Sequence, residues 1–488
     1  KGSFFDLDIS KSVIYLKNEK NTRKFETSLH TKGKIDFAQI KKISSLFNLK
    51  SDFLKNLVTD VNIKTNIFFD LNKKFKVKNL SYSTEGDILD LSFDLERNEI
   101  FKEYLINLSS KLDLKDSKIK FEKSDKTQTL ELVGLVKIQD GFDKFEVTQK
   151  YNYGKKNYHI KGFVGLTNSD FKISKLNYQK NLGEKAELSL DADFSPNKYY
   201  NINQLKFLAG KSKVNLENIK LNKNFETIDL KRIDVKTFID QVKNNDFLVN
   251  KSDQIVIEGE VFDSKPFLKS IYAKEARKTF DKNFTSDIKV DFKKILTGTT
   301  DEIFNFAMIA SIRKGSYDKL SAKGNFSNEE IIEISIYQID NDTRTLQLIS
   351  DRAKPFINNF DFIKGFEGGK LEYQSTIKKE VSNSNLIITD FKVSKVPALA
   401  QLLTLASLQG IADTLNGEGI RFKSIEIKSN TKNNTINVED LLAMGPAVSI
   451  LMEGYVDKGK TVSLRGTLVP ATKLNAIIAS IPLVGDIL

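Results

Sequence analysis

The stretch Ala186-Glu-Leu-Ser-Leu-Asp-Ala-Asp-Phe194 alternates apolar and polar side chains residue by residue. Because successive side chains of a β-strand point to opposite faces, this pattern predicts a strand with one apolar and one wet face. One-sided strands are typical of antiparallel sheets, whereas buried parallel strands are apolar throughout. The same alternation recurs at Leu130–Val133, Ile255–Val261, Asp287–Phe292, Ile332–Tyr337, Ser424–Lys428 and Val448–Tyr455.

Short polar segments such as Asp140-Gly141, Tyr153-Gly154-Lys155 and Asp457–Lys460 separate the predicted strands. Strands spaced by about 8–12 residues are typical of all-β proteins. A single sandwich of 488 residues would be unusually large, and the predicted helices are too few to cover an apolar sheet face. The sequence therefore predicts a mainly β protein with a few short helices, built as a long curved antiparallel sheet that forms an elongated hydrophobic groove.

A few amphipathic stretches predict helices between the strands. Residues 1–250 are predicted to be a strand-rich groove segment, with helices near 36–48, where Asp36 caps the first turn, and near 99–112. Residues 251–488 are predicted to be a second region, with helices near 265–278, 351–359, 397–415 and 471–480.

The last two predicted helices are expected to cap the C-terminal end of the sheet. The tail Leu474–Leu488 is interrupted by Pro482 and is too short to span a bilayer, so it is either a second cap or a segment that contacts a membrane. The side chains expected to cap the sheet are Leu399, Leu402, Leu405, Ile411, Leu474, Ile478 and Ile481.

Composition argues against several classes of function. The chain has 76 Lys and Arg against 64 Asp and Glu, a net charge of +12 without a basic helix, so nucleic acid is not an expected partner. The excess of Lys is read as a solvated surface, with weak attraction to anionic headgroups as the alternative. There is no Cys, and His30 and His159 lack metal-ligand spacing. We expect neither an enzyme nor a metal or other cofactor, because no acid–base pair or nucleophile with a base stands out.

Strand parity alone selects the side chains expected to line the groove, because every second residue of a strand shares a face. The predicted lining residues are Ile255, Ile257, Val261, Ile332, Ile334, Ile336, Ile425, Ile427, Val448, Ile450, Met452, Val462, Leu464 and Leu468.

Several segments in the last third of the chain resemble one known family. The segment Leu346–Ile357 contains Ser-Asp and a predicted short helix. The segment that follows, Ile363–Leu371, ends in Gly-Gly-x-Leu. Val396–Phe422 and the series from Gly445-Pro446 to Ile481-Pro-Leu-Val-Gly485 follow. In order and spacing they resemble the C-terminal region of the AsmA-like superfamily, especially its YhdP-type members; before about residue 250 the likeness is only the strand-rich character.

The resemblance implies a periplasmic protein of a Gram-negative bacterium, shaped as a long β-groove and similar to the bridge-like lipid carriers of eukaryotes. It implies phospholipids as cargo and the inner and outer membranes as partners. An inner-membrane anchor would lie outside this chain, which begins with Lys1 and is expected to be a fragment. Two alternatives remain: an envelope scaffold or outer-membrane assembly factor acting through sheet-edge contacts, and a hydrolase that would need two facing carboxylates.

Overall fold

A computed structural model describes residues 2–4, 7–19, 22–39, 56–94, 103–105, 109–195, 198–270, 280–327, 329–340, 342–357, 364–378, 381–395, 419–432, 435–446, 448–457 and 461–470. Its contacts divide the chain into two compact units, Lys1–Lys243 and Asn244–Leu488. The division falls inside strand β17 (Val242–Lys251), and the boundary predicted from the sequence lies at the end of that strand.

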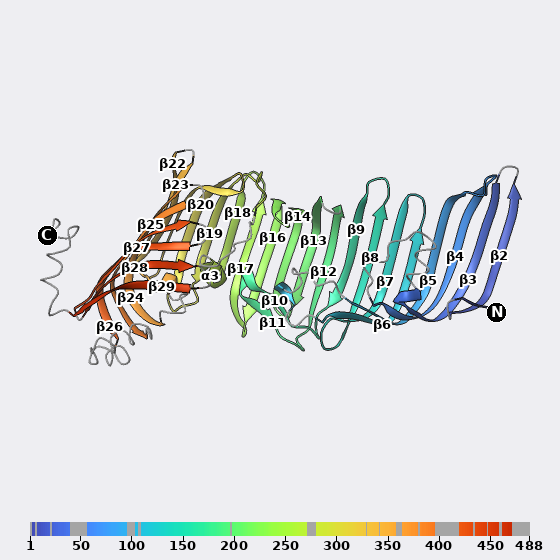
Figure 1. Ribbon diagram of the computed structural model, residues 1–488, viewed down its shortest axis with the longest axis horizontal. Helices are drawn as coiled ribbons and strands as arrows, with labels where there is room; N and C mark the ends of the chain where they lie inside the picture. The colour runs from blue at the N-terminus through green and yellow to red at the C-terminus, as the bar shows by residue number, and fades with distance from the viewer. Residues whose placement is uncertain are drawn as a thin grey trace. The chain divides into compact units, whose positions relative to one another are not determined.

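The first unit is an antiparallel sheet whose strands pair almost entirely in chain order (Figure 1). The exception follows β9, which pairs with β12, while β10 and β11 form a separate hairpin beside the 3₁₀ helix η1 (Ser174–Leu176). The strands are β1 (Gly2–Phe4), β2 (Leu7–Glu19), β3 (Thr22–Asp36), β4 (Val58–Asn72), β5 (Val77–Asp94), β6 (Lys111–Lys123), β7 (Thr127–Lys137), β8 (Phe142–Asn152), β9 (Asn157–Gly165), β10 (Phe171–Ile173), β11 (Tyr178–Lys180), β12 (Ala186–Ser195), β13 (Tyr199–Ala209), β14 (Ser212–Asn222), β15 (Thr227–Asp229) and β16 (Arg232–Ile239).

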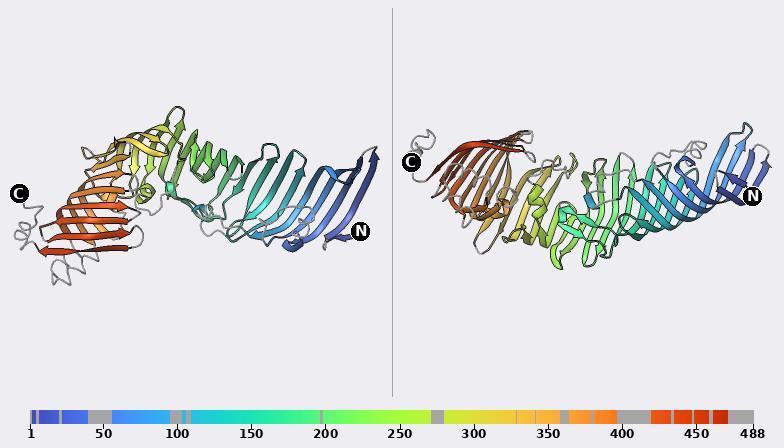
Figure 2. Two further views of the ribbon diagram at one scale, coloured as in Figure 1. Left: turned by 45° about the horizontal axis from the view of Figure 1, so that its top comes forward. Right: turned by 60° about the horizontal axis from the view of Figure 1, so that its bottom comes forward.

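The second unit is also a single sheet, and it is visibly curved in both views of Figure 2. Its pairings are antiparallel except between β18 and β19, which run parallel because the chain crosses back after helix α3 (Lys265–Ser270). After β17 the strands are β18 (Ile255–Asp263), β19 (Ser286–Leu296), β20 (Ile303–Arg313), β21 (Ser316–Asn325), β22 (Ile331–Asp340), β23 (Thr343–Ser350), β24 (Lys364–Lys378), β25 (Val381–Lys395), β26 (Ile420–Lys432), β27 (Thr435–Met444), β28 (Val448–Asp457) and β29 (Thr461–Pro470).

The predicted strands are confirmed, since every alternating segment quoted above lies within a strand, and the protein is mainly β. The predicted cap at Asp36 is confirmed as well. Asp36 Oδ1 accepts a hydrogen bond from the backbone N–H of Gln39 at 2.8 Å, and the Asp36 N–H donates to Gln39 Oε1 at 2.8 Å. This reciprocal arrangement is a capping box, which starts a helix by satisfying free backbone donors.

The remaining helix predictions have mixed outcomes. The helix predicted near 265–278 begins as expected with α3, and the one near 351–359 is the short α4 (Lys354–Ile357). The helix predicted near 99–112 is wrong at its end, because Lys111 and Leu112 already belong to strand β6. Residues 397–415 and 471–480 lie outside the described residues, and so do all seven predicted capping side chains, so the capping helices stay predictions.

Two glycines explain how α4 packs against the sheet of the second unit. Gly368 and Gly369 have φ angles of +72° and +85°, which favour glycine. The backbone N–H of Ala353, just before α4, donates to the Gly369 carbonyl at 2.8 Å. A Cβ on Gly369 would lie 3.1 Å from side-chain atoms of Ile388 and Phe391. The Gly-Gly pair noted in the sequence is therefore required for close packing of the chain.

Replacing Gly369 with Ala should destabilise the second unit by about 2 kcal/mol, because it combines backbone strain with crowding. The matched control is Gly183→Ala, where φ is +82° but nothing lies within 4 Å of the new Cβ. The control should cost about 1 kcal/mol from strain alone. Urea denaturation of both variants measures the difference, and equal losses would show that crowding at Gly369 is unimportant.

Candidate ligand-binding face

The register of the first unit brings its apolar side chains to one face of the sheet. Residues directly opposite each other in paired strands share a face. A single row of such pairs crosses β8, β9, β12, β13, β14 and β16 without interruption. The members of this row are Phe145, Val164, Leu188, Phe207, Val214 and Val235. We call the side of the sheet that carries this row the apolar face of the first unit.

The opposite face of the same strands is polar. Lys150, His159 and Asp193 form one cross-strand row there, and His159 Nδ1 lies 3.1 Å from Asp193 Oδ1. His30 lies on the corresponding side of β3, with Nε2 2.9 Å from Asn62 Oδ1. Both histidines are thus strand residues with hydrogen-bonding partners. The sheet has the single wet side that the alternation predicts.

One end of the apolar face is covered by the segment between β9 and β12. Phe171 of β10 stacks on Phe207 with ring centroids 4.8 Å apart, and Tyr178 of β11 meets Phe207 edge-on at 5.8 Å. Phe207 is only 1% exposed and Tyr178 3%. Aromatic contacts of this kind contribute beyond simple area burial. This segment therefore closes the end of the apolar face nearest to it.

The covering segment is held in place by a buried lysine. Lys180 is fully buried, and its Nζ donates to the carbonyl oxygens of Leu166, Thr167 and Ser169. Burial lowers the pKa of Lys180, and the charge of Glu184 has the largest opposing effect. The three carbonyl acceptors satisfy every donor of the ammonium group, which is the condition for burying such a group at moderate cost.

At its other end the apolar face finishes in a row of aromatic rings. Tyr151, Tyr158, Phe194, Tyr200 and Phe225 follow one another with centroid separations of 4.5, 5.0, 6.1 and 4.6 Å. The first four rings are half-buried, and Phe225 is 45% exposed. Sequence reasoning missed this aromatic row. Its signal is that each ring lies within a few residues of a hairpin turn, so that successive hairpins align the rings.

The phenols near this end are neutral hydrogen-bonding groups. Desolvation raises the pKa of Tyr82, and nearby Tyr153 adds to the shift. Burial likewise raises the pKa of Tyr153, whose hydroxyl donates to Gln128 Oε1 at 3.2 Å. A phenol whose pKa lies above 10 stays protonated at physiological pH. Tyr82 and Tyr153 therefore offer uncharged hydroxyls beside the aromatic row.

In the second unit, the register places all the predicted lining residues on one face. Ile257, Ile334, Ile427 and Met452 belong to a single cross-strand row that runs from β18 to β28. Ile332, Ile425, Ile450 and Leu468 belong to a second row. The remaining predicted residues, which share that face by strand parity or direct pairing, are Ile255, Val261, Ile336, Val448, Val462 and Leu464.

The exposure of these residues changes across the face. Ile332 and Val448 are buried, Ile334 and Ile427 are half-buried, and Val462 is 52% exposed. Leu464, next to Val462 on the same face, is 37% exposed. The face is thus covered at one end of its strands and accessible on β29. That the predicted lining residues form a groove stays a prediction.

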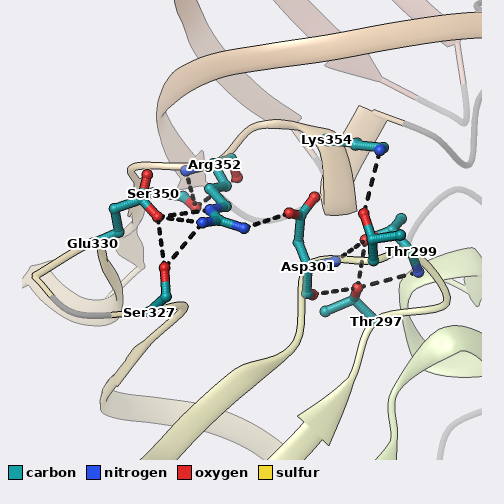
Figure 3. Close-up of polar contacts among 9 residues, drawn as sticks. Thr297, Thr299, Asp301, Ser327, Glu330, Ser350, Arg352 and Lys354 are labelled. Atoms are coloured by element: carbon teal, nitrogen blue, oxygen red, sulfur yellow. Dashed lines mark hydrogen bonds and ion pairs between the residues drawn. The ribbon is translucent and has the colours of Figure 1, made fainter.

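A polar cluster ties together the strand ends of the second unit (Figure 3). Arg352 Nε donates to Glu330 Oε2 at 2.8 Å, and Arg352 Nη1 donates to Asp301 Oδ1 at 2.6 Å. The guanidinium also lies over the Phe326 ring, 5.7 Å from its centroid. These residues come from three connections, before β20, before β22 and after β23. The Arg352 cluster therefore fixes the loops that bring α4 over the sheet.

Acidification should weaken this cluster. The hydrogen bond from Arg352 holds the pKa of Glu330 below its usual value, and the Ile331 N–H does the same for Asp351, which also accepts from Lys370. Both folded pKa values lie below the unfolded ones near 4, so their stabilisation is complete above about pH 5 and is lost as the pH falls through the folded values. Arg352→Met should therefore destabilise the second unit most at neutral pH.

Urea denaturation between about pH 6 and pH 3 checks this, because the difference between wild type and Arg352→Met should shrink with the pH. The control is Arg465→Met, which removes an exposed pair with Glu453 on the sheet surface. Exposed pairs contribute little, so this control should change stability only slightly at any pH. A loss at Arg352 that does not depend on pH would show that packing, not ion pairing, accounts for it.

Comparisons of the chain with protein-family models, curated proteins and solved structures gave no match. The resemblance to the AsmA-like superfamily therefore rests on the sequence segments quoted above. Within the described residues, no helix has the length and apolar character needed to cross a bilayer. Among those same residues, no group of three or more His, Asp or Glu side chains is placed to hold a metal ion.

Proposed function

We propose that this chain is a periplasmic segment of a bridge-like, inner-membrane-anchored protein that carries phospholipid along an apolar β-groove towards the outer membrane. The observation that supports the proposal best is the sharing of one face by apolar side chains over many consecutive strands within each unit. Many of these side chains, such as Leu190 and Ile334, are half-buried rather than buried. An acyl chain lying on such a face would complete their removal from water.

The energetics of such a face suit a carrier. Burying a CH₂ group contributes roughly 0.8 kcal/mol, so an acyl chain of about 16 carbons would gain on the order of 10 kcal/mol. That is enough to hold a lipid out of water. Because neighbouring strands offer similar apolar side chains, the gain changes little from one position to the next. A lipid would therefore slide with small barriers, and no convergent catalytic cluster is needed.

The resemblance to YhdP-type members of the AsmA-like superfamily is the basis for proposing a periplasmic location and transport towards the outer membrane. Two pairs of residues from that resemblance have structural roles in this chain. Ser350 and Asp351 form hydrogen bonds near Arg352, and Gly368 and Gly369 allow close packing at α4. Their role is to shape the fold rather than to do chemistry. We therefore propose a protein that is not an enzyme and that needs no cofactor.

The double variant Ile334→Asp with Leu464→Asp should reduce bound phospholipid at least several-fold, because each carboxylate would face the acyl chains unpaired. The matched control is Ile309→Asp on β20 with Leu451→Asp on β28. Ile309 and Leu451 are 64% and 40% exposed and pair on the opposite, wet face. Organic extraction of the purified proteins followed by mass spectrometry measures the lipid, and circular dichroism checks folding.

Equal lipid in the two double variants would contradict a role for the apolar face. Wild-type protein that carries no phospholipid after purification, and takes up none from vesicles, would contradict the proposed function itself. That result would favour the second candidate, an envelope scaffold. The observation behind this candidate is β29, whose residues Thr461–Thr467 are exposed and which pairs with β28 alone among the described strands. An exposed strand edge of this kind can pair with another chain.

A further inference from the structure

In an antiparallel sheet, every second hairpin turn lies at the same end of the strands. These turns line one side of the sheet, and we call such a line of strand ends an edge. In the first unit, one edge is formed by the turns that follow β4, β6, β8, β12 and β14, at the upper side of the blue-to-green strands in Figure 1. Every one of these turns carries lysine. We call this edge the lysine edge, and its lysines are Lys73, Lys74, Lys76, Lys123, Lys126, Lys155, Lys156, Lys198 and Lys223.

The charge of the lysine edge is largely uncompensated. Asp125 and Glu226 are the acidic residues of these turns, and Glu226 accepts a hydrogen bond from Asn222 Nδ2 at 2.7 Å. Within the described part of the chain, none of the lysines of this edge forms an ion pair with a carboxylate. At the opposite edge, carboxylates such as Asp143 and Asp170 accept hydrogen bonds from the backbone. Positive charge therefore gathers at one edge of the sheet.

The lysine edge coincides with the open end of the apolar face. Tyr151 and Tyr158 of the aromatic row flank the turn that holds Lys155 and Lys156. Lys123 Nζ lies 5.5 Å from the centroid of the Tyr82 ring, and Tyr82 pairs with Lys123 across β5 and β6. Aromatic rings thus separate the apolar side chains of this face from a line of ammonium groups. This order, apolar, aromatic and cationic, matches the order of groups in an amphiphile with an anionic head.

We infer that the lysine edge binds the phosphate of a glycerophospholipid with a net negative headgroup, while the acyl chains lie on the apolar face of the first unit. The inference rests on the proposed function and adds the class of lipid and its orientation. Ammonium groups on flexible stems bind phosphate as point charges, so the preference for anionic lipid should be graded and should weaken as salt rises. As a lipid moves across successive strands, each turn of the lysine edge provides another lysine for its phosphate.

The test uses the full chain and two lipids that differ in headgroup charge, phosphatidylglycerol and phosphatidylcholine, with the same fluorescent acyl chain. The two are offered in equal amounts in mixed vesicles, and protein-bound lipid is separated and counted. Wild type should load phosphatidylglycerol in roughly three- to tenfold excess at low salt, the range expected for a few exposed ion pairs. The variant Lys73→Gln, Lys74→Gln, Lys155→Gln, Lys156→Gln should lose most of that excess and still load phosphatidylcholine.

A charge-matched control removes Lys137, Lys175, Lys185 and Lys211, which lie at the opposite edge, by the same change to Gln. It should keep the wild-type preference. Equal loading of the two lipids by wild type, or equal losses in both variants, would overturn the inference and leave the proposed function standing. Absence of loading with either lipid would instead overturn the proposed function, and the inference with it.

Vesicle flotation distinguishes a bound headgroup from contact with a membrane surface. Suppose the lysine-edge variant floats less with phosphatidylglycerol vesicles but loads the two lipids in the wild-type ratio. The lysines would then contact the membrane rather than the cargo, and the inference would be wrong. A lost preference with unchanged flotation supports headgroup binding along the lysine edge.

Discussion

The strict pairing register of the strands is the constraint on which the rest of the structure depends. A slip of one residue would move every apolar side chain of a strand to the wet face. In the second unit the row through Ile257, Ile334 and Ile427 crosses the sheet without leaving its face. Where a strand carries an extra residue, an Asn or Asp takes a positive φ, as at Asp116 and Asn305. These bulges absorb the extra residue and restore the register beyond it.

Much of this arrangement can be predicted from the sequence, because alternation with period two is a local property. The strands around Ile255, Ile332 and Val448 were predicted from it, and so was the face that their apolar side chains share. Local irregularities in a strand limit what alternation can predict. Phe422 and Ile425 are three residues apart, which parity would assign to opposite faces. The register pairs them with Phe391 and Ile388 without a shift, yet Ile388, Phe391 and Phe422 are all buried. Asp390, between the two partners, has a φ of +55°, a local departure from strand geometry that alternation does not indicate.

The features that sequence reasoning missed all depend on contacts between distant segments. Arg352 meets Asp301 across 51 residues, and nothing in the local pattern of either segment indicates the partner. The aromatic row depends on hairpin lengths, which decide whether Tyr158 and Phe194 arrive beside each other. Lys180 looked like one of many surface lysines, yet it is buried because three carbonyls of the preceding turn point at it. In each case the role of the residue depends on which distant segment lies beside it in the fold, and not on the local composition.

The two ends of the apolar face in the first unit differ in a way that matters for any amphiphile. At one end, Phe171 and Tyr178 pack on Phe207 and bury its ring. At the other end, half-buried rings give way to hydroxyls and then to lysines. In the proposed function, a lipid on this face would have its lowest free energy with its head at the lysine edge, because the reverse orientation would bury a phosphate among aromatic rings. Movement across successive strands keeps the head in water and exchanges one apolar contact for another. If the chain carries lipid as proposed, the polarity difference between the two edges would fix the orientation of the lipid, and the similarity of the strands would leave its position along the sheet free.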